Sequence, residues 1–230
     1  MIESPFKALA LYSEVFQNTF LDCLDSGKCD MISCTSLSLS QDGFERWWRN
    51  YDSYKEKVIL RPQRVSNNPS LIRRLGVISM NTPVEFDIYG HVNSSLIGGT
   101  RMINGIGGSN DFTSNAYISI MHCPSVRPSR SDPIGISSVV PMVSHVDHTE
   151  HDVAVVVTEQ GLADLRGLAP RERALEIIKK CAHPDYRDYL QDYYDRSCVA
   201  TGFHHEPHIL KEVYNMHVNL QEKGTMRFWR

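Results

Sequence analysis

GGTRMINGIGGSNDF, at residues 98–112, holds five of the 14 glycines of this chain. It separates an apolar run that ends at Ile97 from a second run at residues 116–121. Glycine lacks a Cβ, so a ligand can closely approach consecutive backbone N–H groups. Residues 104–109 are therefore a candidate site for a phosphate, a pyrophosphate or an oxygen that becomes negative during a reaction. A tight structural turn is the alternative, because the glycines match neither the dinucleotide-binding nor the Walker pattern.

The overall composition is that of an ordinary globular protein. Of the 230 residues, 41% are hydrophobic and 22% are charged, which suits one large α/β domain or one domain with a tail. The formal net charge of −3 argues against a nucleic acid or a membrane surface as a partner held by electrostatics. Since there is no membrane-spanning run and no signal-peptide layout, we expect a soluble protein that is not secreted.

Six cysteines are scattered along the chain without the C-x-x-C spacing of zinc or redox sites. We expect each of them to be a small buried thiol in a reducing compartment. They are Cys23, Cys29, Cys34, Cys123, Cys181 and Cys198.

Short apolar runs alternate with helical patterns, which predicts an α/β fold with an open, mainly parallel sheet and flanking helices. The predicted strands are residues 8–12, 32–39, 77–81, 84–89, 116–121, 136–143 and 153–157. The predicted helices are residues 16–24, 44–54, 69–75, 170–181 and 186–197, with a further periodic segment before Gly224. Residues 124–135 have the composition of a surface loop, and the aromatic stripe within residues 44–54 favours packing over nucleic-acid stacking.

Two glutamates directly follow predicted strands. Glu14 follows the first strand, and Glu159 follows the unbroken apolar run at residues 153–157. Ligands of open parallel sheets gather at the carboxyl ends of the strands, so the two acids suggest one site. For Glu14 alone, a helix cap or a solvated charge is the alternative. Gly161 and the residues after it predict a tight turn from strand into helix.

Residues 144–152 combine three histidines with three acids, which could supply metal ligands. The segment lacks the HExxH arrangement of hydrolase metal sites. We therefore expect an interlocked polar turn, in which histidines bond to carboxylates, and no metal site. Asn67 and Asn68 precede Pro69 and are typical of a helix cap.

Five long motifs, in the same order, resemble the acetyl-CoA hydrolase/transferase family, whose members are class I CoA-transferases. They are SEVFQN from Ser13, VSNNPSLIRRLGVISMNTPVEFDIYGHVNSS from Val65, MINGIGGSNDF from Met102, ISSVVPMVSHVDHTEHDVAVVVTEQGLADLRGLAPRERA from Ile136 and CAHPDYRDYL from Cys181. The loop PSVRPSRSDPIGISS and the ending NLQEKGTM are most similar to fungal mitochondrial members.

This resemblance implies a CoA-transferase domain of the NagB/RpiA-like type at residues 1–200. A helical C-terminal tail at residues 201–230 is expected to pack on it. Family members carry two similar α/β halves with the active site between them, and this sequence resembles the second half only. A mitochondrial location, or otherwise a cytoplasmic one, and a homodimer of the full-length form are further implications.

The resemblance also implies a catalytic role for four residues. Glu14 is similar to the nucleophile that attacks the acyl-CoA carbonyl and then forms a glutamyl-CoA thioester. The backbone N–H of Gly108 is similar to the oxyanion donor. Asn67 and Glu159 resemble the polar residues that position the nucleophile and line the acyl pocket.

The implied ligands are acetyl-CoA, succinyl-CoA, acetate and succinate, with no cofactor beyond the CoA of the substrate. Gly107, Gly108 and Arg130 are the candidate CoA contacts. Bacterial members have a lysine near CoA that has no clear counterpart in this sequence, and Arg130, or alternatively Arg127, could take its role. Two other functions stay open: a non-catalytic CoA-binding or interaction fragment, and a histidine-rich metallohydrolase. Because the first half is lacking, we expect the isolated chain to turn over acetyl-CoA poorly or not at all.

Overall fold

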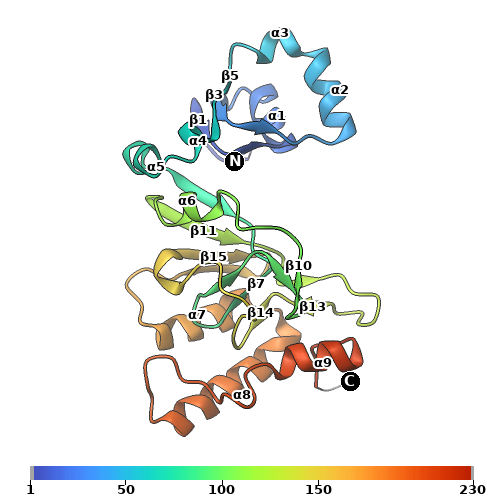
Figure 1. The fold of residues 1–230 in the computed structure, drawn as a ribbon, viewed down its shortest axis with the longest axis vertical. Helices are drawn as coiled ribbons and strands as arrows, with labels where there is room; N and C mark the ends of the chain where they lie inside the picture. Colours follow the sequence, from blue (N-terminus) through green and yellow to red (C-terminus); the bar gives the residue numbers. More distant parts are fainter. Residues whose placement is uncertain (1–2, 229–230) are drawn as a thin grey trace. The chain divides into compact units, whose positions relative to one another are not determined.

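The chain folds into two compact units, which are unit 1 (Met1–Val77) and unit 2 (Ile78–Arg230) (Figure 1). The structure is a computed structural model that describes residues 3–228. Each unit has its own cluster of buried apolar side chains. The helix that follows residue 201 in the described part of the chain, α9 (Asn215–Lys223), belongs to unit 2.

Unit 1 is built on a parallel sheet with the strand order β1-β3-β5. Its strands are β1 (Leu9–Tyr12), β3 (Cys29–Cys34) and β5 (Val58–Leu60), with a separate parallel pair of β2 (Val15–Phe16) and β4 (Ser36–Leu37). Its helices are α1 (Asn18–Asp25), α2 (Gln41–Arg49), α3 (Tyr51–Tyr54), α4 (Gln63–Ser66) and α5 (Pro69–Leu75). The predicted first strand and the helix at residues 69–75 are confirmed. The predicted strand at residues 32–39 is divided between β3 and β4.

The core of unit 1 forms around Trp47 of α2, whose ring packs edge-on against Phe16 with the centroids 5.6 Å apart. The predicted helix at residues 44–54 is divided at Asn50 into α2 and α3. Of the aromatic stripe predicted there, Trp47 is buried, whereas Phe44 and Trp48 are about half exposed. The predicted packing role is thus confirmed for Trp47 in the core of unit 1, but not for Phe44 and Trp48.

The main sheet of unit 2 has the strand order β16-β15-β11-β6. Its strands are β6 (Ile78–Asn81), β11 (Ile118–His122), β15 (Val155–Thr158) and β16 (Gly161–Asp164). The first three run parallel to one another, and β16 is antiparallel to β15. The apolar run that predicted a central parallel strand is β15, so this prediction and the mainly parallel α/β fold class are confirmed.

A second sheet of unit 2 has the order β14-β7-β8. It contains β7 (Glu85–Asp87), β8 (Val92–Asn93) and β14 (Val139–Val140). Unit 2 also has two antiparallel pairs of short strands. They are β9 (Leu96–Ile97) with β10 (Arg101–Met102) and β12 (Val126–Arg127) with β13 (Ile136–Ser137). The continuous strand predicted at residues 136–143 is wrong, since it breaks into β13 and β14. The surface loop predicted at residues 124–135 is only partly right, because it contains β12 and the buried side chain of Asp132.

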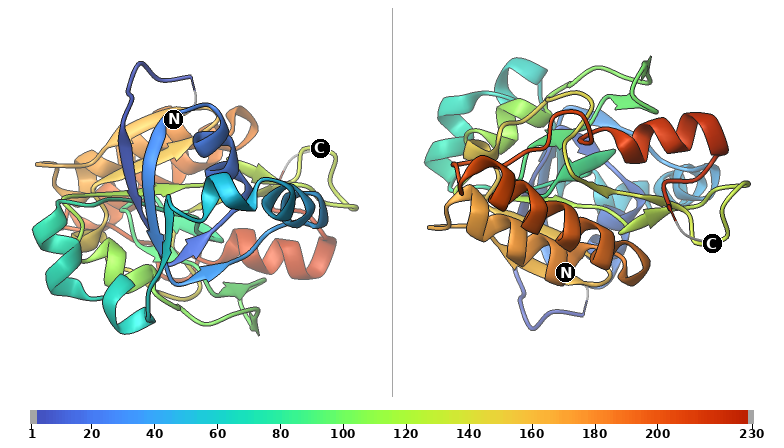
Figure 2. Two further views of the ribbon diagram at one scale, coloured as in Figure 1. Left: turned by 90° about the horizontal axis from the view of Figure 1, so that it is seen from above. Right: turned by 90° about the horizontal axis from the view of Figure 1, so that it is seen from below.

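Helical segments pack around the sheets of unit 2. They are α6 (Ser109–Thr113), the 3-10 helix η1 (Glu150–Asp152), α7 (Pro170–Cys181), α8 (Pro184–Thr201) and α9 (Asn215–Lys223). Helix α7 packs on β15 and β16, and α8 lies alongside α7 (Figure 2). Met216 of α9 and Met226 after it lie in the same core as these helices. Two polar contacts also hold the C-terminal segment: His217 Nε2 lies 3.0 Å from Glu85 Oε2, and Arg227 pairs with Asp132.

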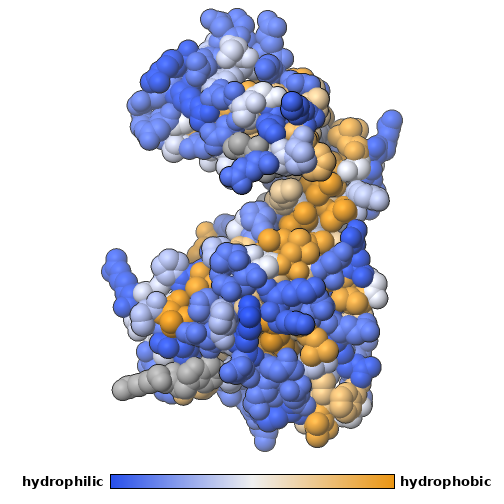
Figure 3. Space-filling view, turned by 180° about the vertical axis from the view of Figure 1, so that it is seen from behind, coloured by the Kyte–Doolittle hydropathy of each residue, from blue (hydrophilic) through white to orange (hydrophobic). Residues whose placement is uncertain are grey.

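One face of the main sheet carries exposed apolar side chains. Ile78 and Met80 of β6 are 52% and 54% exposed, and Leu162 of β16 is 53% exposed. Their register partners Ile118, Ile120 and Val157 are half-buried. Hydrophobic side chains gather on unit 2 in the space-filling view (Figure 3). Parallel sheets are usually covered on both faces, and this face is not covered by the described residues of unit 2. It is therefore an apolar surface of unit 2.

The predicted burial of the cysteines is confirmed, since all six are buried free thiols, and the reducing compartment stays a prediction. Among residues 3–228, no helix is long and apolar enough to cross a membrane.

Candidate active site

Glu14 lies at the carboxyl end of β1, in the bend before β2, as predicted. Its backbone carbonyl accepts hydrogen bonds from the N–H groups of Thr35, at 2.8 Å, and Ser36, at 3.2 Å. The N–H of Ser13 donates to the carbonyl of Ser33 at 2.9 Å. These bonds hold the Glu14 backbone at the edge of the sheet where the strands end. Its side chain is half-buried, so it is neither a core residue nor a fully solvated charge.

Asn67 lies at the end of α4, and its side chain is buried. Its N–H donates to the carbonyl of Gln63 at 2.8 Å. The hydroxyl of Tyr12 in β1 donates to the carbonyl of Val65 in α4 at 2.6 Å. Tyr12 stands two residues before Glu14, and Val65 stands two residues before Asn67. One hydrogen bond within unit 1 therefore ties together the segments that carry both predicted residues.

The cap expected at this turn is made by Asn68, the neighbour of Asn67. The Asn68 Oδ1 atom accepts from the N–H groups of Ser70, at 2.9 Å, and Leu71, at 3.2 Å, at the start of α5. At the other end of α5, Gly76 adopts the left-handed conformation with φ of 64°. The helix boundaries that the sequence predicts here are confirmed at both ends.

The glycine-rich stretch of unit 2 forms a turn that leads into α6. Gly107 adopts φ of 55°, a conformation that favours glycine, and Gly108 is the buried N-cap residue of α6. The N–H of Ser109 donates to the carbonyl of Ile106 at 3.2 Å, and the N–H of Phe112 donates to the carbonyl of Gly108 at 3.2 Å. The stretch is therefore a tight turn, which is one of its two interpretations, and the anion site remains a prediction.

Glu159 lies in the two-residue hairpin turn between β15 and β16. Its prediction at the carboxyl end of a strand is confirmed, but the strand-to-helix turn predicted at Gly161 is wrong. Gly161 pairs with Thr158 in antiparallel register and begins β16. A glycine after two turn residues suits a tight hairpin as well as it suits a helix start.

The carboxylate of Glu159 is bound by Ser125, which follows β11. The N–H of Ser125 donates to Oε2 at 2.8 Å, its hydroxyl donates to Oε1, and Gln160 Nε2 also donates to Oε1, at 3.0 Å. Burial alone would raise the pKa of Glu159, but these hydrogen bonds outweigh it and lower the pKa to about 2. At neutral pH Glu159 is thus a carboxylate that accepts hydrogen bonds and cannot supply a proton.

The two arginines considered for CoA differ in their surroundings. Arg127 is half-buried and donates to the carbonyls of Pro83, at 2.5 Å, and Val84, at 3.2 Å. It anchors its loop to the segment that follows β6. Arg130 lies further along the loop and is exposed. Arg130 is therefore the more exposed of the two, and its contact with CoA stays a prediction.

The histidine-rich segment forms the interlocked polar turn that its composition predicts. His151 Nε2 lies 3.0 Å from Glu150 Oε1, and His145 Nε2 lies 3.5 Å from Asp147 Oδ1. On its other oxygen, Glu150 pairs at 3.0 Å with His91 Nε2. Among residues 3–228, the group of side chains close enough to hold a metal ion together is His91, Glu150 and Glu206. The expectation that no metal binds stays a prediction.

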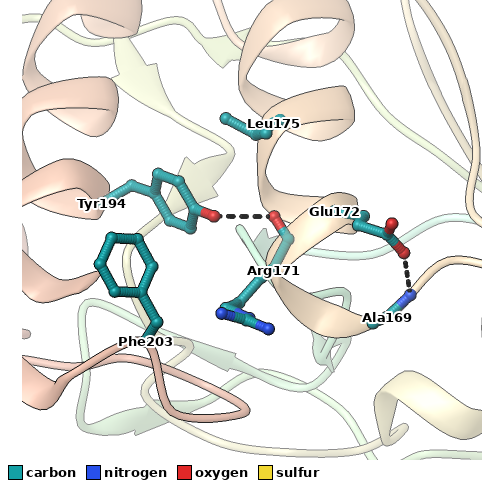
Figure 4. A pocket seen from close by; sticks show the side chains of 6 residues that line it. All are labelled: Ala169, Arg171, Glu172, Leu175, Tyr194 and Phe203. Atoms are coloured by element: carbon teal, nitrogen blue, oxygen red, sulfur yellow. Dashed lines mark hydrogen bonds between the residues drawn. The ribbon is translucent and has the colours of Figure 1, made fainter.

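Unit 2 also has a surface pocket of about 250 Å³ on α7 and α8 (Figure 4). The hydroxyl of Tyr194 donates to the carbonyl of Arg171 at 3.0 Å at its wall, and Glu172 accepts from the N–H of Ala169. Its lining residues are Ala169, Arg171, Glu172, Leu175, Tyr194 and Phe203. Because it contains none of the predicted site residues, this pocket is separate from the candidate active site.

Sequence reasoning missed two partners in unit 2. Ser125 binds Glu159, and His148 binds Ser109. Ser125 follows a predicted strand, as Glu14 and Glu159 do, so the same strand-end signal could have singled it out. The sequence predicts His148 only as a member of a polar turn, and no local signal connects it with Ser109.

The mainly parallel sheets with flanking helices place the chain among proteins with a CoA-transferase-type fold. RipA from Yersinia pestis has 26% sequence identity and a TM-score of 0.71, and the match covers 87% of this chain and 46% of that one. 4-Hydroxybutyrate CoA-transferase from Porphyromonas gingivalis has 23% identity and a TM-score of 0.61, with 83% and 46% covered, and it supports the fold alone.

The chain belongs to the acetyl-CoA hydrolase/transferase family, because the family model of the acetyl-CoA hydrolase/transferase C-terminal domain matches residues 43–194. The protein named acetyl-CoA hydrolase in Candida glabrata is 59% identical over 230 residues, which are 99% of this chain and 44% of that protein. The acetyl-CoA hydrolase of Saccharomyces cerevisiae is 56% identical over 225 residues, 96% of this chain and 43% of that protein. The chain thus spans less than half the length of these relatives, and the resemblance seen in its motifs is confirmed.

Proposed function

We propose that this chain is the C-terminal catalytic part of an enzyme that moves CoA between acyl-CoA and a carboxylate or water. The observation that carries the proposal is the 59% identity, over nearly the whole chain, to a protein named acetyl-CoA hydrolase. Acetyl-CoA is the donor in this proposal, and acetate and succinate are the carboxylates. No cofactor is needed beyond the CoA of the substrate.

Glu14 is the nucleophile in the proposed reaction. Its carboxylate oxygen attacks the thioester carbonyl, and the C–S bond breaks to give a glutamyl–acyl mixed anhydride and CoA thiolate. The thiolate then attacks the glutamyl carbonyl, which releases the acyl group as a carboxylate and leaves a glutamyl-CoA thioester. The hydrogen-bonded strand end that holds the Glu14 backbone supports this role, since a nucleophile requires a fixed position.

Charge builds up on the carbonyl oxygen at each attack, and the N–H of Gly108 is the proposed donor that stabilises it. A side chain at this position would restrict the approach of the tetrahedral centre. Removal of one such donor typically costs about 100-fold or more in rate. The burial of Gly108 at the start of α6 supports the role, because a donor in a fixed, partly desolvated position is more effective.

Asn67 and Glu159 are the proposed polar residues of the acyl pocket. Arg130, together with Gly107 and Gly108, is the proposed contact for the phosphates of CoA. The low pKa of Glu159 supports a role as a hydrogen-bond acceptor and argues against one as a general acid. Hydrolysis and transfer share the glutamyl-CoA thioester. Which product forms depends on whether water or an acceptor carboxylate attacks it.

Borohydride trapping tests the proposal directly. The parent protein that contains this chain is incubated with acetyl-CoA and then with borohydride, which reduces a glutamyl thioester to the alcohol. A peptide map is expected to show the change at Glu14 only. Glu14→Gln should abolish both the modification and turnover, while Glu45→Gln, an exposed glutamate of unit 1 bonded to Gln41, should leave both intact. Full turnover by Glu14→Gln would refute the mechanism.

A second assay separates the two products. Succinate is added to the acetyl-CoA reaction of the same parent protein, and succinyl-CoA is measured. Its formation indicates transfer, and acetate release without succinyl-CoA indicates hydrolysis alone. We also propose a mitochondrial location and a homodimer for the parent protein, which cell fractionation and light scattering test.

A non-catalytic fragment that binds CoA is the second candidate, and the observation that favours it is that the chain covers 44% of its relatives' length. We expect CoA to bind the isolated chain weakly and acetyl-CoA to be turned over poorly or not at all. Calorimetry with CoA and a thiol-release assay on the 230-residue chain measure the two properties. Rapid turnover by the chain alone would exclude this candidate.

A further inference from the structure

The turn that carries Gly108 is bonded to a histidine from a distant part of unit 2. The hydroxyl oxygen of Ser109, the residue directly after Gly108, lies 2.9 Å from Nε2 of His148. The two residues are 39 positions apart in the chain. Ser109 is the first residue of α6, so the contact is made where the turn becomes a helix.

The backbone of His148 is fixed independently of this contact. Its carbonyl accepts from the N–H of Val92 at 2.8 Å, and its N–H donates to the carbonyl of Val92 at 3.1 Å. The preceding Asp147 accepts from the N–H of Ser94, at 2.6 Å, and from the hydroxyl of Ser95, at 2.7 Å. His148 is thus mounted on β8 and the segment after it, and its ring reaches from there to Ser109.

The ring is almost completely buried, with 1% of the residue exposed. Burial lowers the pKa of His148, although the charges of Asp147 and Asp152 oppose this, so the ring is neutral at pH 7. Within the described part of the chain, its Nδ1 atom has no hydrogen-bond partner. A buried N–H without an acceptor costs more than a bare lone pair. The favoured tautomer therefore carries its proton on Nε2 and donates it to the Ser109 hydroxyl.

We propose that His148 is a positioning residue, which through Ser109 holds the Gly108 N–H in the orientation that an oxyanion requires. The inference rests on the proposed function of Gly108. It explains how a turn of mostly exposed residues, with a glycine on either side of Ile106, presents one amide in a fixed direction. Glycines allow the turn but do not hold it, whereas a hydrogen bond to a buried ring does.

The position of an oxyanion donor matters because misplacement by about 1 Å can cost on the order of 100-fold in rate. Loss of the His148 contact should therefore lower kcat and leave KM nearly unchanged, since the oxyanion exists in the transition state and not in the bound substrate. If His148 had a purely structural role, its replacement would lower the fraction of folded protein, and the remaining folded enzyme would not show a lower kcat at an unchanged KM.

The test uses three variants and a matched control. His148→Leu removes the donor, His148→Gln places an amide N–H near the position of Nε2, and Ser109→Ala removes the acceptor. Ser114→Ala is the control, because Ser114 lies at the other end of α6 and its hydroxyl donates to Asn110. The first measurement is the Gly108 amide in the ¹⁵N-labelled 230-residue chain, by chemical shift and hydrogen exchange.

We expect Ser109→Ala and His148→Leu to shift this amide resonance and to speed its exchange about fivefold or more, whereas Ser114→Ala changes neither. The ¹⁵N pattern of His148 should be that of a neutral ring with the proton on Nε2. In the parent enzyme, both variants should lower kcat by about 10- to 100-fold with KM within about twofold, and His148→Gln should recover most of the loss.

An unchanged Gly108 amide in both Ser109→Ala and His148→Leu would overturn the proposal. So would a moved amide with an unaltered kcat in the parent enzyme. Since Ser109→Ala is a small change at a half-buried side chain, it provides an answer even where His148→Leu does not fold. Glu14→Gln tests the proposed function separately. Full turnover by this variant would show that the proposed mechanism is wrong, whereas the Gly108 amide measurement does not depend on it.

Discussion

Ser125 holds the Glu159 carboxylate by both oxygens, with its N–H on Oε2 at 2.8 Å and its hydroxyl on Oε1. The two residues follow β11 and β15, which run parallel, so both lie at the edge of the sheet where these strands end. These bonds hold the carboxylate of a glutamate in an exposed hairpin turn and lower its pKa to about 2.

Ser125→Ala should therefore raise the pKa of Glu159 from about 2 part of the way toward the ordinary glutamate value of 4.5, because the hydroxyl bond to the charged form is lost while the backbone N–H bond remains. A pH titration of the glutamate side-chain carbons by ¹³C NMR measures the change. Ser129→Ala is the matched control, since Ser129 lies in the same loop and contacts Ser131 instead. An unaltered Glu159 titration in Ser125→Ala would contradict the assignment.

Tyr12→Phe should destabilise unit 1 by about 1 kcal/mol, which is the usual net contribution of one hydrogen bond. The variant leaves the Val65 carbonyl without the Tyr12 hydroxyl that binds it at 2.6 Å, and so loosens α4 from β1. Urea unfolding measures the loss. Tyr51→Phe, at an exposed tyrosine of the same unit, is the control and should unfold like the unmodified chain.

The ion pairs of His91 predict a dependence of stability on pH. Burial alone would lower the pKa of His91, but the bond to Asp87 and the charges of Asp87, Glu206 and Glu150 overcome this and raise the pKa from 6.5 to about 9. A group with a raised pKa in the folded state contributes fully below its unfolded pKa and loses that contribution as the pH rises through the folded value. The stabilisation should be present below about pH 6.5 and lost by about pH 9.

His91→Gln should remove this dependence and lower the free energy of unfolding by roughly 2–3 kcal/mol near pH 6.5, with a smaller difference above pH 9. Urea unfolding across this range is the measurement. His151→Gln serves as the control, because His151 also pairs with Glu150 but its side chain is 82% exposed. Parallel stability curves for His91→Gln and the unmodified chain would rule out the role of His91.

The C-terminal segment should depend on a buried ion pair. Arg227 Nη2 lies 2.8 Å from Oδ1 of Asp132, whose side chain is 0% exposed. Asp132→Asn leaves the arginine without its counter-charge and should cost on the order of 3 kcal/mol in the free energy of unfolding. Asp164→Asn breaks a pair with Arg166 in which the side chains are 46% and 55% exposed, and it should change the free energy of unfolding much less, because solvent screens an exposed pair. Equal losses in thermal or urea unfolding would disprove the distinction.

Local patterns were sufficient where neighbouring residues determine the conformation. The helix at residues 69–75 is an example, because Asn68 caps its start, Pro69 suits its first turn and Gly76 takes the left-handed conformation at its end. The same holds for the position of Glu14 after the first strand and for the buried run that became β15. The prediction at Gly161 was wrong because a glycine after two polar residues fits a hairpin and a helix start equally well, and pairing with Thr158 decided between them.

The sequence alone was enough to determine the family, the parallel α/β class and the strand ends at which Glu14 and Glu159 lie. Only the tertiary structure decided which side chains meet these positions, such as Ser125 on Glu159 and His148 on Ser109, which are 34 and 39 residues apart. The physical reason is that helix and strand patterns report interactions between residues a few positions apart. Contacts over longer separations follow from the order in which strands pair, which is set by the packing of the whole sheet.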